Sequence, residues 1–165
     1  MTEQELYALM DERGIGYEVF HHEAVATVAE ADAIVPRLAI PTKNLFLRDD
    51  KKRQFVLVVA HEDSPVDLKR LHKVLGTRRL SFASPEQLWD VLGLVQGSVT
   101  PFGVLNDATR EVLLVFDERL EHQRFDAHPM VNTATMFVEV DEVLPLFVEH
   151  GTRVVFADLS CAGVE

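Results

Sequence analysis

Residues 42–60 read TKNLFLRDDKKRQFVLVVA, two apolar runs separated by a short charged stretch. The runs at 44–48 and 54–60 are rich in Leu, Val and Phe, which is typical of β-strands. The five charged residues at 49–53 between them are typical of an exposed turn. The stretch therefore predicts a β-hairpin, with Lys43 at the entrance to its first strand.

Strand and helix patterns surround this hairpin without strict alternation. Thr2 followed by Glu5 predicts the start of a first helix that ends at Gly14. The further strands are predicted at 17–21, 79–82, 111–116, 135–140 and 153–157. The further helices are predicted just before Pro36, at 67–75, at 84–92, and from Asp141 toward Gly151, with Pro145 in about the first turn. About seven strands with four or five helices predict an α+β fold. We expect residues 1–165 to form a single domain around one mixed, curved, partly barrel-like sheet flanked by helices.

The composition is that of one globular domain. The chain has 165 residues, of which 47% are hydrophobic and 26% charged. Its apolar runs are short, so no membrane-spanning helix and no membrane partner is expected. No signal-peptide pattern opens the chain, and a single cysteine, Cys161, rules out an internal disulfide. We therefore expect a cytoplasmic protein.

The charge is distributed unevenly along the chain. The net charge of −11 argues against a phosphate-rich partner, yet residues 43–79 hold ten basic and five acidic side chains. This segment is thus +5 and the remainder −16. Such asymmetry can guide a polyanion to one face of an acidic protein. A solvated hairpin tip beside an ordinary helix surface is the alternative.

Two segments offer polar or flexible groups to a ligand. Lys43 can present its ammonium to a phosphate, a carbonyl oxygen or a hydroxyl, or else extend into solvent. In Gly97-Ser98-Val99-Thr100-Pro101, the glycine permits unusual backbone angles and the proline limits freedom. The backbone there can approach a ligand closely, or the segment is only a connecting turn.

A third candidate is His128, the one histidine of seven that precedes a proline. A lone histidine is often structural, and the histidines show no zinc-binding spacing, so neither a metal nor another cofactor is expected. Cys161 lies too near the C-terminus to be a good nucleophile, and Ser98 lacks the nucleophile-elbow pattern. Attack by a positioned water on an activated ester is the hydrolysis that such a set could support.

Taken in order, three motifs carry a family resemblance. Thr-Lys-Asn-Leu-Phe-Leu at 42–47, the segment Gly97–Pro101, and His-Pro-Met-Val-Asn-Thr-Ala-Thr at 128–135 resemble the YbaK/prolyl-tRNA synthetase-associated domain family of freestanding tRNA-editing proteins. They look most like the branch that removes alanine from tRNA(Pro). The resemblance implies a metal-independent, trans-acting aminoacyl-tRNA deacylase that protects translation fidelity. Its expected partners are aminoacylated tRNA(Pro) and, transiently, prolyl-tRNA synthetase, with no DNA.

The resemblance also assigns roles to residues. Lys43 and His128 are expected to be catalytic. The expected substrate-binding residues are Asn44, Gly97, Ser98, Val99, Thr100 and Pro101. The expected tRNA-binding residues are Lys51, Lys52, Arg53, Lys69, Arg70, Lys73, Arg78 and Arg79. Two alternatives stay open: hydrolysis of another ester, on Cys-tRNA(Pro) or with Ser or Thr as the amino acid, and a non-catalytic tRNA-binding domain of the same fold.

Overall fold

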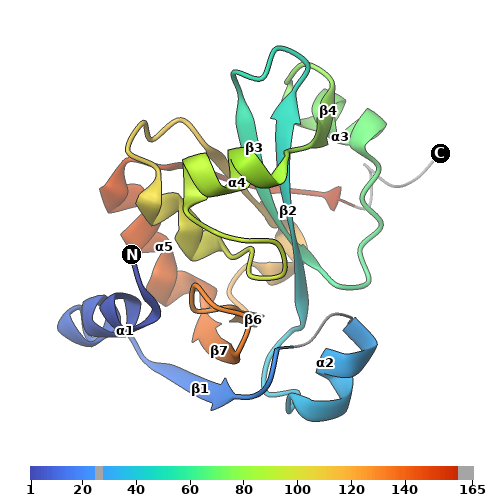
Figure 1. Ribbon diagram of the computed structural model, residues 1–165. Helices are drawn as coiled ribbons and strands as arrows, with labels where there is room; N and C mark the ends of the chain where they lie inside the picture. The colour runs from blue at the N-terminus through green and yellow to red at the C-terminus, as the bar shows by residue number, and fades with distance from the viewer. Residues whose placement is uncertain (25–27, 160–165) are drawn as a thin grey trace.

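The computed structural model describes residues 1–24 and 28–159, and its strands form two open sheets (Figure 1). A three-stranded antiparallel sheet has the order β1-β7-β6, and a five-stranded mixed sheet has the order β4-β2-β3-β5-β8. The strands are β1 Tyr17–His21, β2 Thr42–Asp49, β3 Phe55–His61, β4 Leu80–Phe82, β5 Leu113–Asp117, β6 Arg124–Ala127, β7 Ala134–Glu139 and β8 Arg153–Ala157. The α+β class is confirmed, but the strands do not form one partly barrel-like sheet.

The predicted hairpin is the antiparallel pair β2–β3, in which Leu45 lies opposite Val58. β4 extends the sheet on one side of the hairpin, and the parallel strands β5 and β8 extend it on the other. The sequence did not predict β6, which has four residues and carries charges at Arg124 and Asp126. One isolated parallel bridge, between Ile40 and Phe125, joins the two sheets just before β2 begins.

Three helices begin at their predicted N-caps. Thr2 and Asp67 accept backbone N–H groups at the starts of α1 and α3, and Ser84 forms a reciprocal capping box with Gln87 at the start of α4. The helices are α1 Glu3–Glu12, α2 Val28–Ile34, α3 Leu68–Leu75, α4 Pro85–Leu92 and α5 Val140–His150, with short 3₁₀ helices η1 Pro101–Asn106 and η2 Glu118–Leu120.

One helix differs from its prediction. α5 begins at Val140, one residue earlier than expected, so Pro145 lies inside the helix and past its first turn. A proline there lacks the N–H that would bond to the carbonyl one turn earlier. Burial of Val143, Leu146 and Phe147 on either side of the proline holds the helix together across that missing bond.

The five-stranded sheet is buried on both faces. On one face Phe46, Leu57 and Leu114 pack with α1, α5 and the three-stranded sheet. On the other face Leu47 and Val58 pack with Leu71 of α3 and its neighbours. Among residues 1–24 and 28–159, no helix has the length and hydropathy needed to cross a bilayer. Cys161 lies outside the described residues.

Candidate active site

A small cavity lies where β2 extends beyond the end of β4. β4 pairs only with Leu47–Asp49 of β2, and Ala83 then donates its N–H to the Phe46 carbonyl at 3.0 Å. The adjoining cavity measures about 120 Å³. It is lined by residues 44–46 of β2, by residues 82–85 and Leu88, and by Gln96 and Val99 of the next loop. Two of the three motifs therefore meet at one small cavity.

Two polar side-chain atoms from these motifs have no hydrogen-bond partner among the described residues. Asn44 Oδ1 and Thr100 Oγ1 are both buried and unpaired among the described residues. Thr100 is fully buried. Leaving a buried polar atom unpaired costs on the order of 1–3 kcal/mol. At Asn44, which lines the cavity, a polar group of a bound ligand or a water would relieve that cost. Thr100 does not line the cavity.

The loop before η1 is packed into the protein and contributes Val99 to the wall of the cavity. Gly97 has φ +90°, in the left-handed region that favours glycine, and a Cβ placed there would lie 3.5 Å from Asn132 Nδ2. The loop therefore approaches the 128–135 motif. Ser98 is buried and its hydroxyl donates to the Val95 carbonyl at 2.8 Å, whereas Val99 faces the cavity. Pro101 begins η1, a helix that the sequence did not predict.

Lys43 lies half-buried on β2, opposite Ala60 of β3. Successive strand residues point to opposite faces, so Lys43 shares a face with Leu45, and Asn44 takes the other. Lys43 does not line the cavity, but both of the residues that follow it do. The backbone of Lys43 thus adjoins the cavity lining, while its side chain lies on the face of β2 opposite Asn44.

Asp126 fixes the start of β2 next to Lys43. Its carboxylate accepts the Thr42 N–H at 2.8 Å, and its backbone carbonyl accepts the Thr42 hydroxyl at 2.9 Å. Burial raises the pKa of Asp126 to about 6, although the hydrogen bonds from Thr42 oppose that rise. β6 then leads directly to His128, so Asp126 connects the first motif to the third. No local signal marks Asp126, because its partner is 84 residues away in the sequence.

Replacing Asp126 with asparagine is expected to raise the free energy of unfolding at pH 7 by up to about 3 kcal/mol. The folded pKa of about 6 exceeds the usual value of 3.8, so the native state binds more protons between these values. The stabilisation from the protonated group is therefore lost as the pH rises from about 4 to 6. Urea denaturation at pH 4.5 and pH 7 checks this, and a difference between wild type and Asp126→Asn that does not change with pH would refute it.

His128 follows β6, with its Nδ1 3.3 Å from the Ala134 carbonyl oxygen. Burial lowers the pKa of His128, the hydrogen bond to Ala134 opposes that change, and the nearby His22 lowers the pKa further. A neutral imidazole that donates from Nδ1 leaves Nε2 free to accept a hydrogen bond. His22, which the sequence did not single out, bonds through its Nε2 to Thr135 Oγ1 at 2.9 Å.

For the deacylation that the sequence resemblance implies, the rate is expected to be constant above about pH 6.5 and to fall about tenfold per pH unit below the lowered pKa of His128. Protonation removes the free acceptor on Nε2. The measurement is a pH–rate profile, corrected for spontaneous ester hydrolysis, for wild type and His128→Gln. The variant should be slower and lack this acid limb, whereas His122→Gln, at an exposed histidine paired with Asp141, should keep it. An unchanged acid limb in His128→Gln would contradict the assignment.

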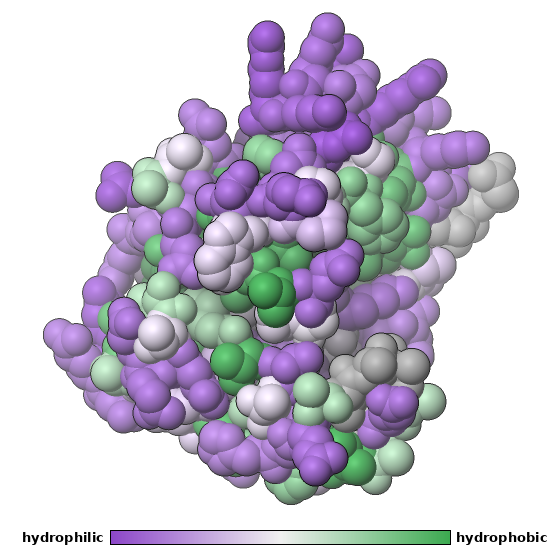
Figure 2. Space-filling view, in the orientation of Figure 1, coloured by the Kyte–Doolittle hydropathy of each residue, from purple (hydrophilic) through white to green (hydrophobic). Residues whose placement is uncertain are grey.

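The predicted tRNA-binding side chains gather at one end of the molecule, which we call the basic end. It comprises Lys51, Lys52 and Arg53 of the hairpin turn, Lys69, Arg70 and Lys73 of α3, and Arg78 and Arg79 before β4. Figure 1 places the hairpin tip, α3 and β4 together, and Figure 2 shows long hydrophilic side chains that project there. Arg78 also pairs with Asp50, Nε to Oδ1, at 2.5 Å. Along β2, the turn is about 17 Å from Asn44.

A metal site is not apparent among the described residues, which contain no group of three His, Cys, Asp or Glu side chains placed to hold an ion.

Comparison with known proteins identifies the family. The model of the aminoacyl-tRNA editing domain matches residues 22–146. Prolyl-tRNA editing protein ProX of Acetoanaerobium sticklandii is 41% identical over 152 residues, which cover 91% of this chain and 93% of that protein. Prolyl-tRNA synthetase associated domain-containing protein 1 of Danio rerio is 36% identical over 145 residues, 86% of this chain and 78% of that protein.

A further relative and a solved structure are also similar to this chain. Multifunctional Ser/Thr-tRNA deacylase ProXp-y of Escherichia coli is 31% identical over 105 residues, 62% of this chain and 63% of that protein. A solved structure described as a candidate trans-editing enzyme for prolyl-tRNA synthetase superposes with a TM-score of 0.68 at 22% identity, covering 94% of this chain and 95% of its own, and supports the fold. The match to the family model and the identity to its relatives show that this chain belongs to the aminoacyl-tRNA editing domain family.

Proposed function

We propose that this protein is a trans-editing aminoacyl-tRNA deacylase that hydrolyses Ala-tRNA(Pro). Deacylation as such follows from family membership and from relatives named as a prolyl-tRNA editing protein and a Ser/Thr-tRNA deacylase. The observation that carries the proposal is the cavity of about 120 Å³ that Asn44 lines, where Asn44 Oδ1 has no hydrogen-bond partner among the described residues. Its volume suits a small aliphatic acyl group better than a bulky one.

The reaction needs only a water and a well-placed ester. Water oxygen attacks the ester carbonyl carbon and forms a tetrahedral intermediate, whose negative charge lies on the former carbonyl oxygen. The bond from carbon to the ribose oxygen then breaks, that oxygen takes up the proton that the attacking water loses, and free alanine and tRNA(Pro) leave. The neighbouring ribose hydroxyl of the substrate can orient the water or move the proton.

Each motif has a place in this scheme. The Lys43 ammonium would hold the ribose-phosphate or carbonyl end and stabilise the developing negative charge. Asn44 Oδ1 would accept a hydrogen bond from the alanyl amino group, and neutral His128 would orient the ester through Nε2. The loop from Gly97 to Pro101 would limit the size of the side chain. The basic end would meet the phosphates of the acceptor stem.

There is a physical reason for a separate deacylase that removes a wrongly attached amino acid from tRNA. An enzyme that binds a larger apolar substrate rejects a smaller one by only about 10- to 200-fold, since the smaller side chain still fits. Prolyl-tRNA synthetase faces this problem with alanine. A deacylase whose cavity admits alanine and excludes proline would hydrolyse the mischarged Ala-tRNA(Pro). It would receive this tRNA from the synthetase during a transient contact, or bind it from solution.

Hydrolysis of Ser- or Thr-tRNA is the second candidate, because the chain resembles a protein named as a Ser/Thr-tRNA deacylase. Asn44 is compatible with it, because its unpaired Oδ1 at the cavity could accept a hydrogen bond from a substrate hydroxyl.

The deciding experiment measures hydrolysis of Ala-, Pro-, Cys-, Ser- and Thr-tRNA by the wild-type protein. Cleavage of Ala-tRNA(Pro) with Pro-tRNA(Pro) spared supports the proposal. Preference for the seryl, threonyl or cysteinyl ester would move the chain to a sister activity. Cleavage of none would leave a tRNA-binding domain.

A further inference from the structure

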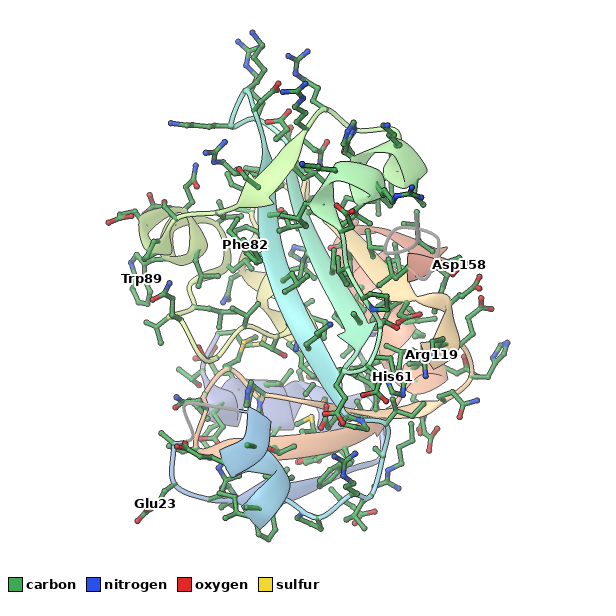
Figure 3. The ribbon with its side chains drawn as sticks, turned by 90° about the vertical axis from the view of Figure 1, so that its right-hand side faces the viewer. Glu23, His61, Phe82, Trp89, Arg119 and Asp158 are labelled. Carbon is green, nitrogen blue, oxygen red and sulfur yellow. The ribbon has the colours of Figure 1, made fainter. Side chains whose placement is uncertain are left out.

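Two large aromatic side chains are exposed on β4 and α4, two elements that contribute residues to the cavity lining. Phe82 is 60% exposed and Trp89 is 61% exposed. Phe82 ends β4 and itself lines the cavity. Trp89 lies one helical turn after Pro85, which also lines the cavity, so their side chains share a face of α4 about 6 Å apart. Figure 3 labels both aromatic residues, on the neighbouring elements β4 and α4.

The charges around these rings are arranged unevenly. Arg79 precedes Phe82 by about 10 Å along the chain, and the rest of the basic end lies beyond it. Exposed Glu86 and Asp90, four residues apart, lie together on one side of Trp89 on α4. A nucleic acid strand would therefore direct its phosphates toward the arginines, while its bases contact the ring faces.

We propose that Phe82 and Trp89 form a stacking platform for the unpaired nucleotides that precede the aminoacylated adenosine at the 3′ end of the tRNA. The identity of this occupant rests on the proposed function. With the acyl group in the cavity and the paired stem at the basic end, the unpaired nucleotides must cross the surface between them. Phe82 lies on that route, and Trp89 adjoins it.

Stacking on aromatic rings suits these nucleotides chemically. Every base has a π face, so stacking adds affinity without reading sequence. That is appropriate for a 3′ end common to all tRNAs. Recognition of tRNA(Pro) would then depend on contacts elsewhere, and the platform would hold any charged 3′ end while the cavity selects the acyl group. The competing occupant of the same surface is a second copy of this chain.

The platform carries its own reporter, because Trp89 is the single tryptophan of the chain. An uncharged RNA hairpin with an unpaired 3′ ACCA end is titrated into the wild-type protein, alongside the same hairpin with a blunt end. We expect the ACCA hairpin to quench the tryptophan emission and the blunt hairpin to leave it almost unchanged. Unchanged emission, at concentrations where the anisotropy of labelled ACCA RNA shows saturation, would overturn the proposal.

Variants separate stacking from other effects. In the anisotropy assay, Trp89→Ala and Phe82→Ala are each expected to raise the Kd about tenfold. Trp89→Phe, which keeps a ring, should recover most of the affinity. Val148→Ala, at an equally exposed residue of α5 that does not line the cavity, is the matched control and should bind as wild type does. Wild-type affinity in Trp89→Ala would overturn the platform.

These results can be told apart from failure of the proposed function, because uncharged RNA tests binding without ester cleavage. Quenching by ACCA RNA in a protein that cleaves no alanyl ester would refute Ala-tRNA(Pro) as the substrate and support the platform. Cleavage of Ala-tRNA(Pro) together with full RNA binding by Trp89→Ala would refute only the platform. In sedimentation experiments, a dimer that Trp89→Ala dissociates without loss of RNA affinity would assign the surface to a second copy instead.

Discussion

Replacing Lys43 with alanine is expected to lower kcat/KM for hydrolysis of Ala-tRNA(Pro) by about 10²- to 10³-fold. Negative charge develops on the carbonyl oxygen when water attacks, and Lys43 lies half-buried directly before the cavity-lining Asn44 and Leu45. A cation in partly desolvated surroundings stabilises such charge more than one in bulk water. The measurement is single-turnover deacylation, which reports the chemical step without product release.

The controls decide whether the loss is chemical. Urea denaturation should show that Lys43→Ala stays folded, because the lysine is only half-buried and pairs across the sheet with Ala60. Lys69→Ala removes an exposed lysine from α3 and should cleave alanyl-adenosine, which lacks the acceptor stem, at the wild-type rate. Lys43→Arg keeps the charge in a larger, planar group and should recover only part of the rate. Turnover near that of wild type in a folded Lys43→Ala protein would remove the lysine from the mechanism.

Elements with local signals could be predicted from the sequence. The β2–β3 hairpin follows from two apolar runs and a charged turn, and α4 follows from Ser84, Pro85 and Gln87 at its start. Capping and turn formation depend on residues a few positions apart, so a single sequence contains them. The nearness of residues 97–101 to the cavity was expected only through the family resemblance.

Features that depend on distant pairing could not be predicted. β6 is short and charged, and its pairing with β7 and the bridge from Phe125 to Ile40 determine that the strands divide into two sheets. The bond between Asp126 and Thr42 spans 84 residues, and neither residue type marks it. The exposure of Trp89 could not be predicted either, because an aromatic residue on a helix is usually expected to face the core.

Reversing charge at the hairpin tip should weaken action on tRNA without affecting the chemistry of the ester. For Lys51→Glu/Arg53→Glu we expect kcat/KM for Ala-tRNA(Pro) to fall about 10- to 100-fold at low salt, because two phosphate contacts become repulsive. Both side chains are exposed, and the turn lies about 17 Å from Asn44 along β2. Hydrolysis of alanyl-adenosine should therefore stay at the wild-type rate.

A matched variant separates local from overall charge. Arg110→Glu/Arg153→Glu changes the net charge of the chain by the same amount, at exposed arginines outside the basic end. If the basic end contacts the acceptor stem, this control should lose little activity, and its rate should keep the steep salt dependence of wild type. The Lys51/Arg53 variant should instead show a shallower dependence, because fewer counterions are released when tRNA binds. Equal losses in the two variants would mean that the net charge alone governs the encounter, and the acceptor stem would then have to contact another surface.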